Sequence, residues 1–89
     1  MSCYLEVRGF HLRRGYLFKE VAAVGCDGST IHTWVFRPPQ PWASLTYEDK
    51  SSVRRSEIGL AWNDGTVPHS SVERVFEILA RQYTVWVVG

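Results

Sequence analysis

Three acidic side chains are the candidates for metal-dependent chemistry in this sequence. Glu6 and Glu20 lie in two segments that we expect to pair as antiparallel strands, and Asp64 lies in a later turn. A two-metal nuclease needs several carboxylates that converge on Mg²⁺ ions about 4 Å apart. These three form an incomplete set, and the two glutamates can instead pair with Arg8 and Lys19. We therefore expect no catalytic residue, no metal and no cofactor, with Mg²⁺ needed only by a residual nuclease.

The other nucleophiles and metal ligands do not follow the spacing of a known site. The cysteines and histidines of the chain are Cys3, His11, Cys26, His32 and His69. They form no C-x-x-C or H-x-x-x-H pair of the kind that zinc sites use. A Cys–His nucleophilic pair is not favoured over a buried thiol and a strand histidine. The chain also has no glycine-rich phosphate loop, so nucleotide-dependent chemistry is not expected.

A group of basic side chains could instead contact phosphate. Its members lie at an expected hairpin tip and on a short expected helix: His11, Arg13, Arg14, Lys50, Arg54 and Arg55. If tip and helix converge, five full positive charges could hold a nucleic-acid backbone while Trp42, Trp34 or Tyr16 stacks on bases. Eight of the ten basic residues are Arg, which favours planar contacts with phosphate. The alternative is that these are ordinary solvated charges, because the net charge is only +1.

Length and composition limit the class of protein. The 89 residues, 45% of them hydrophobic and 13% aromatic, predict one domain over residues 1–89 with an aromatic-rich core. The first residues do not read as a signal peptide, and no apolar run approaches the roughly 20 residues of a membrane span. Two cysteines do not suggest a disulfide framework. We expect a cytoplasmic or nuclear protein with reduced thiols and no membrane contact.

The first half of the chain predicts three strands in an antiparallel meander. Residues 4–8 alternate between apolar and polar, residues 16–25 are long and apolar, and residues 30–36 alternate again. Residues 11–14 form the tip between the first two strands. Asp27 and Gly28 mark the turn before the third strand. Three prolines in residues 37–42 then end the sheet, because proline cannot donate to a strand ladder.

Two helices and a last strand are predicted for the second half. Asp49 or Ser51 can cap a short helix over residues 52–58 that stops at Gly59. Pro68 and a capping box at residues 70–73 mark the start of a second helix. Its apolar stripe consists of Val72, Val75, Phe76, Leu79 and Tyr83.

Residues 83–88 are rich in β-forming residues and predict the final strand. A right-handed crossover would place this strand parallel to the first one. The fold class is therefore α+β, in the order β-β-β-α-α-β. Two helices are too few to cover both faces of such a sheet, so we also expect a homodimer.

This order resembles the first half of the ribonuclease H-like fold. The ordered segments LEVRGF (5–10), FKEVA (18–22), HTWVFRPP (32–39), PW (41–42), GLAWNDG (59–65), VP (67–68) and VWVVG (85–89) resemble a set of uncharacterised proteins. Those proteins are encoded in arthropod genomes, their mobile elements and invertebrate viruses. The resemblance covers nearly the whole chain, but only the front half of the longer relatives.

The resemblance implies a shortened, exonuclease-like domain that has lost catalysis. Longer relatives would place further acidic residues beyond Gly89, and Glu6 stands where the first strand would carry Asp. With the basic side chains, the resemblance predicts a non-catalytic nucleic-acid-binding module whose ligand is RNA or DNA, duplex RNA being one candidate. Kinship alone implies a viral origin and an action on host RNA pathways. The alternative is a protein-interaction or homodimerisation module without nucleic-acid contact. The third reading is a residual metal-dependent nuclease.

Overall fold

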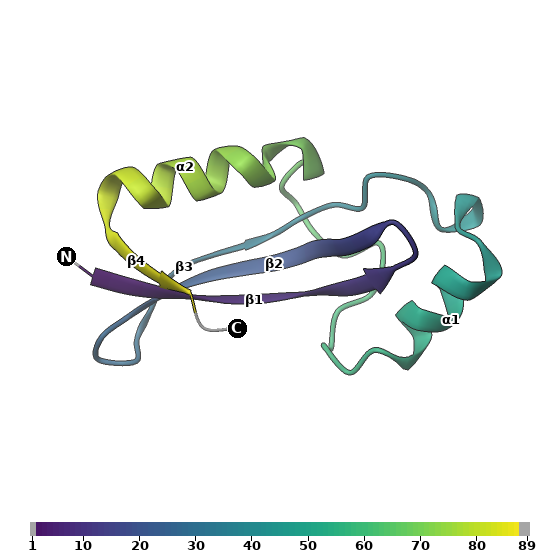
Figure 1. Cartoon of the computed structure of the whole chain (residues 1–89), viewed down its shortest axis with the longest axis horizontal. Helices are drawn as coiled ribbons and strands as arrows, with labels where there is room; N and C mark the ends of the chain where they lie inside the picture. Colours follow the sequence, from purple (N-terminus) through teal and green to yellow (C-terminus); the bar gives the residue numbers. More distant parts are fainter. Residues whose placement is uncertain (1, 88–89) are drawn as a thin grey trace.

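The protein is a four-stranded sheet with two α-helices packed at opposite ends (Figure 1). The computed structural model describes the backbone of residues 2–87 and the side chains of residues 2–83. The strands are β1 (Ser2–Leu12), β2 (Gly15–Gly25), β3 (Thr30–Val35) and β4 (Thr84–Val87), and the helices are α1 (Tyr47–Arg55) and α2 (Val72–Gln82). The sheet order is β3-β2-β1-β4, antiparallel except for the parallel pair β1–β4.

The α+β class, the three-stranded antiparallel meander and the two helices are confirmed within residues 2–87. β1 is longer than predicted and continues to Leu12, so only Arg13 and Arg14 form the hairpin tip. β4 covers Thr84–Val87, and the Val88 of the predicted strand lies outside the described residues. No helix in the described part of the chain is long and apolar enough to cross a membrane.

The predicted bounds of the first helix were wrong. α1 begins at Tyr47 because the Thr46 hydroxyl accepts a hydrogen bond from the Asp49 backbone N–H at 3.2 Å. It ends at Arg55, so Glu48 and Asp49 lie in the first turn and Arg54 and Arg55 lie in the last turn. This distribution of charge complements the helix dipole. A helix over residues 52–58 would instead have had Glu57 in its last turn.

The second helix has the predicted apolar stripe but a different start. α2 begins at Val72, after a 3-10 turn over His69–Ser71, and Ser71 makes no side-chain capping bond within residues 2–87. The predicted capping box is therefore not what starts this helix. The stripe is confirmed: Val72, Val75 and Leu79 are buried, and Phe76 and Tyr83 pack against the same core.

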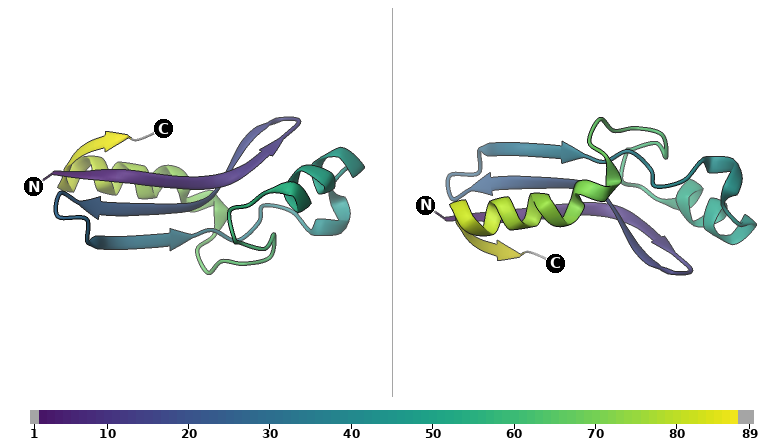
Figure 2. Two further views of the ribbon diagram at one scale, coloured as in Figure 1. Left: turned by 90° about the horizontal axis from the view of Figure 1, so that it is seen from below. Right: turned by 90° about the horizontal axis from the view of Figure 1, so that it is seen from above.

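Two separate cores lie on opposite faces of the sheet. At one end, α2 covers Leu5, Val21 and Ala23. At the other end, Phe10 faces the opposite way and packs with Leu45 and Trp62 beside α1. Figure 2 shows α2 in front of the strands from one side and behind them from the other. The molecule is correspondingly elongated, with extents of 43 × 23 × 20 Å.

A β-bulge in β2 marks the change from one core to the other. The pairing with β1 shifts between Arg8 and Gly9, which leaves Lys19 as the extra residue of β2. A bulge residue is re-aimed relative to the regular alternation of the strand. A side chain on Gly9 would overlap the Leu17 carbonyl oxygen, so this position of the paired strands requires glycine.

The Lys19 side chain is buried and fully hydrogen-bonded. It is 1% exposed, and its Nζ donates to the carbonyl oxygens of Phe36 at 2.9 Å, Trp62 at 2.7 Å, and Asp64. An ammonium group has three N–H donors, so each donor has one acceptor. Burial lowers the pKa of Lys19, and the Asp64 carboxylate partly opposes this shift. Lys19 thus ties β2 to the end of β3 and to the turn at residues 62–64.

His69 lies close to this buried lysine, at the start of the turn before α2. Its Nε2 is buried and has no hydrogen-bond partner among residues 2–83. Its ring lies 6.3 Å from that of Phe36. Burial lowers the pKa of His69, a hydrogen bond with the Phe18 backbone opposes the shift, and the charge on Lys19 adds to it. The folded protein therefore favours neutral His69.

We expect Lys19→Met to lower the free energy of unfolding by about 3 kcal/mol. The substitution orphans three carbonyl groups at a cost of ~1–3 kcal/mol each, and water can reach the part-buried carbonyl of Asp64. Urea unfolding followed by circular dichroism would measure the change. Lys50→Met is the matched control, because Lys50 is the other lysine and lies at the surface of α1. Equal unfolding midpoints for the two variants would contradict the anchoring role of Lys19.

We also expect stability to fall as the pH drops below the ordinary histidine pKa. The folded-state pKa of His69 is lower than 6.5, so between the two values the unfolded chain binds more protons. Stability is therefore lost as the pH falls through 6.5 toward the lowered value. Urea midpoints between about pH 7 and about pH 5 would show the decline. His69→Gln should flatten this dependence, whereas His32→Gln, at an exposed histidine, should preserve it.

Candidate nucleic-acid interface

The tip of the β1–β2 hairpin is held against α1 by two hydrogen bonds. The Arg13 backbone N–H donates to Asp49 Oδ1 at 2.9 Å, and Ser52 Oγ donates to the His11 carbonyl oxygen at 2.6 Å. Both bonds use the backbone of the tip, so they leave its side chains available. The side chains of Arg13 and Arg14 are exposed. The structure thus brings together two basic segments that are separated by about 40 residues in sequence.

Two further cations of α1 lie over the ring of Trp42. Lys50 Nζ is 5.9 Å and Arg54 Cζ is 5.4 Å from the ring centroid, distances typical of cation–π contacts. Trp42 also packs edge-on against Trp62 at 6.3 Å. We give the name tip–helix surface to the region formed by the half-buried Lys50 and the exposed His11, Arg13, Arg14 and Arg54. Arg55, also exposed, is turned about 100° around the helix axis from Arg54, so we leave it outside this surface.

The aromatic candidates for base stacking have different environments. Trp42 is half-buried beneath its two cations, and Trp34 is half-buried against the α2 core and the His32 ring. Tyr16 is 40% exposed. Its ring packs edge-to-face against the rings of His11 and Phe18, with centroid distances of 4.9 and 5.3 Å. Burial raises the pKa of Tyr16. Tyr16 is therefore the open ring nearest the hairpin tip.

The structure does not gather the candidate carboxylates into a metal site. Glu20 forms an ion pair with Arg8 at 3.6 Å, and the exposed Glu6 lies diagonally across the strand pair. Asp64 Oδ2 accepts from the Ala61 N–H at 2.8 Å within its own turn. In the part of the chain that the structure describes, no group of three Cys, His, Asp or Glu residues could hold a metal ion. The alternative pairing of a glutamate with Lys19 was wrong, because Lys19 binds carbonyl groups inside the protein.

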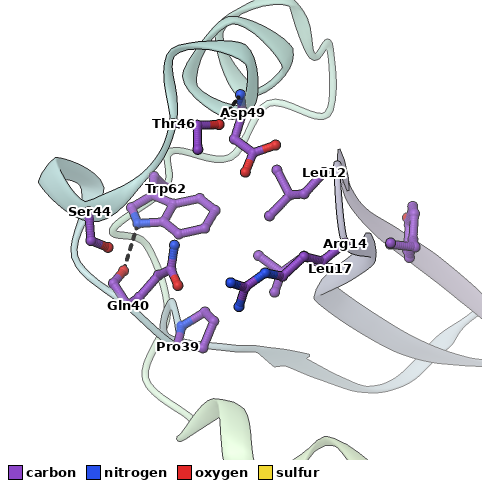
Figure 3. A pocket seen from close by; sticks show the side chains of 11 residues that line it. Leu12, Arg14, Leu17, Pro39, Gln40, Ser44, Thr46, Asp49 and Trp62 are labelled. Carbon is purple, nitrogen blue, oxygen red and sulfur yellow. Dashed lines mark hydrogen bonds between the residues drawn. The ribbon is translucent and has the colours of Figure 1, made fainter.

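A cavity of about 460 Å³ lies beside the tip–helix surface (Figure 3). Leu12, Leu17 and Trp62 contribute apolar walls, and Arg14 and Asp49 contribute charge. The Trp62 indole N–H donates to the Gln40 carbonyl oxygen at 3.0 Å, which joins two of the lining segments. The lining residues come from the hairpin, the segment before α1, the first turn of α1 and the turn after it. No local sequence spacing could have identified them as one site.

The chain has no recognisable counterpart in the comparisons with known proteins. No protein-family model matches it, and no match is found among curated proteins or among solved structures. A functional assignment consequently rests on the contacts described above: a backbone-anchored basic tip, a helix that adds two cations, and an adjoining cavity.

Proposed function

We propose that this chain is a non-catalytic nucleic-acid-binding module and that the tip–helix surface is its contact region. The observation that carries the proposal is the anchoring of the tip on α1 by the Asp49 and Ser52 bonds. This anchoring sets the exposed arginines of the tip beside a helix that adds two cations, Lys50 and Arg54. The four full positive charges of the surface outnumber the two nearby carboxylates, Glu48 and Asp49.

The physical basis of binding would be the release of counterions from phosphates. Each phosphate that an Arg or Lys side chain neutralises releases condensed counterions, which makes affinity strongly dependent on salt. A fixed tip backbone reduces the conformational entropy that binding must remove. Arginine also offers a planar fork that fits two phosphate oxygens. The partner that we propose is a nucleic acid, with duplex RNA as the first substrate to test.

We further propose that the fold is related to the ribonuclease H-like fold. The antiparallel meander, and a β4 that lies parallel to β1 after the helices, support this interpretation. The viral origin and the action on host RNA pathways belong to the same proposal and rest on the sequence resemblance. The proposed cytoplasmic or nuclear location rests on the two cysteines and on the lack of a long apolar run in the sequence. A residual nuclease finds no support among the described residues, where Glu20 is paired with Arg8.

The double substitution Arg13→Ala/Arg14→Ala should weaken binding to labelled duplex RNA about tenfold at low salt. It should also reduce the slope of log affinity against log salt by about 2, since each phosphate contact contributes roughly 1. Fluorescence anisotropy at about 50 and 200 mM salt would measure both quantities. Arg74→Ala/Arg81→Ala on α2 is the charge-matched control, because both side chains are exposed outside the tip–helix surface. Equal losses in the two double variants would refute the assignment of the surface.

A second candidate function is homodimerisation or binding of a protein partner through the sheet. Among the described residues, no helix covers the face opposite α2 at the end where α2 packs (Figures 1 and 2). The strand register places Tyr4, Ala22, Val24 and Thr33 on this face. Ala22 and Val24 are themselves buried, at 7% and 5% exposure, so a partner would pack on the half-buried Tyr4 and the exposed Glu6 and Thr33 around them.

If the second function holds, sedimentation velocity should show a dimer at micromolar concentration. Thr33→Arg should shift the protein toward monomer, because it places a large charge at an exposed position on this face. Thr66→Arg, at an exposed position outside the four strands, should leave the dimer intact. If the wild-type protein stays monomeric at micromolar concentration, homodimerisation is ruled out.

A further inference from the structure

The geometry points to the cavity beside Trp62 as a site for one unpaired guanine base of the bound strand. This inference rests on the proposed nucleic-acid-binding function and adds a base preference to it. The cavity volume of about 460 Å³ is within the roughly 300–1,000 Å³ typical of small-molecule sites. It adjoins the tip–helix surface, because Arg14 belongs to both.

The walls of the cavity suit a flat heterocycle. Leu12 and Leu17 line one side, and Pro39 and Trp62 line the other (Figure 3). Trp62 is only 4% exposed, and Phe10 and Trp42 pack against it at 5.9 and 6.3 Å, so the ring is a fixed wall. Proteins that recognise unpaired bases commonly hold them against aromatic or apolar surfaces and bind their Watson–Crick edges.

Asp49 provides the acceptors that select the base. Its Oδ1 is oriented by the Arg13 N–H at 2.9 Å, and Figure 3 shows the carboxylate directed toward the cavity. Guanine presents two adjacent donors, N1–H and N2–H₂, which match one carboxylate. Uracil presents a single donor between two carbonyl oxygens, which the carboxylate would repel. Adenine and cytosine each present one amino group on this edge, so guanine gains most from Asp49.

Two other side chains complete the match to a guanine nucleotide. The Gln40 amide points into the cavity, where its N–H can donate to the guanine O6 (Figure 3). The Arg14 guanidinium also lies at the cavity and carries the charge needed for the phosphate. The base would therefore enter the cavity while its phosphate remains on the tip–helix surface. The Asp49 and Ser52 bonds hold the tip on α1 and so keep this arrangement formed before binding.

The test compares short oligouridylate strands with and without one central guanine. We expect the guanine strand to bind about tenfold more tightly, the discrimination typical of a good two-bond base contact. Asp49→Asn should abolish this difference, because it replaces one acceptor oxygen with a donor and still offers an acceptor to Arg13. Glu48→Gln is the control: it removes the same charge from an exposed neighbour in the same helical turn and should retain the difference.

A second measurement separates the base site from the strand-binding surface. GMP, but not UMP, should shift the NMR signal of the Trp62 indole N–H, which donates to Gln40 at the cavity. If strands bind with equal affinity and GMP causes no shift, the base site is refuted and the proposed surface stands. If GMP alone shifts Trp62 and no strand binds at low salt, the proposed function fails and the base site stands. The comparison of GMP with UMP uses the wild-type protein and does not depend on the folding of a variant.

Discussion

The buried ammonium group of Lys19 is the interaction on which the rest of the architecture depends. It occupies the bulge of β2 and binds carbonyl groups at the end of β3 and in the turn at residues 62–64. A buried charge is costly unless all its donors are paired, so these three backbone segments must arrive together. Trp62 is one of the segments held in this way, and its ring is a central member of the second core.

A chain of contacts leads from this anchor to the candidate interface. The Trp62 carbonyl oxygen binds Lys19, while its ring contacts Phe10 and Trp42. Trp42 in turn lies beneath Lys50 and Arg54. The indole of Trp62 also forms a wall of the cavity. The surface cations and the cavity are consequently positioned by packing and hydrogen bonds that begin inside the sheet, and not by the surface residues alone.

The sequence predicted the parts of the fold that repeat with a regular period. Alternation identified the strands, and the stripe on α2 identified its buried face, because local periodicity directly reflects burial. Lys19 could not be recognised in this way, since its partners are backbone carbonyls up to 45 residues away. The start of α1 was missed because Thr46, Asp49 and Ser51 are all suitable caps within one short polar segment. The basic residues were identified by type. The sequence could not show that the hairpin tip and α1 lie side by side, because the bonds that join them come from Asp49 and Ser52.

The division of the sheet between two cores has a consequence for how β1 can evolve. Its odd-numbered residues Cys3 and Leu5 are buried under α2, whereas beyond the bulge the even-numbered Phe10 is buried and His11 is exposed. Neither face of this eleven-residue strand is therefore free along its whole length. An insertion or deletion of one residue near Gly9 would exchange inward and outward positions for only one of the two cores. Lineages that keep both cores must consequently conserve the length of β1 more strictly than the identity of most of its side chains.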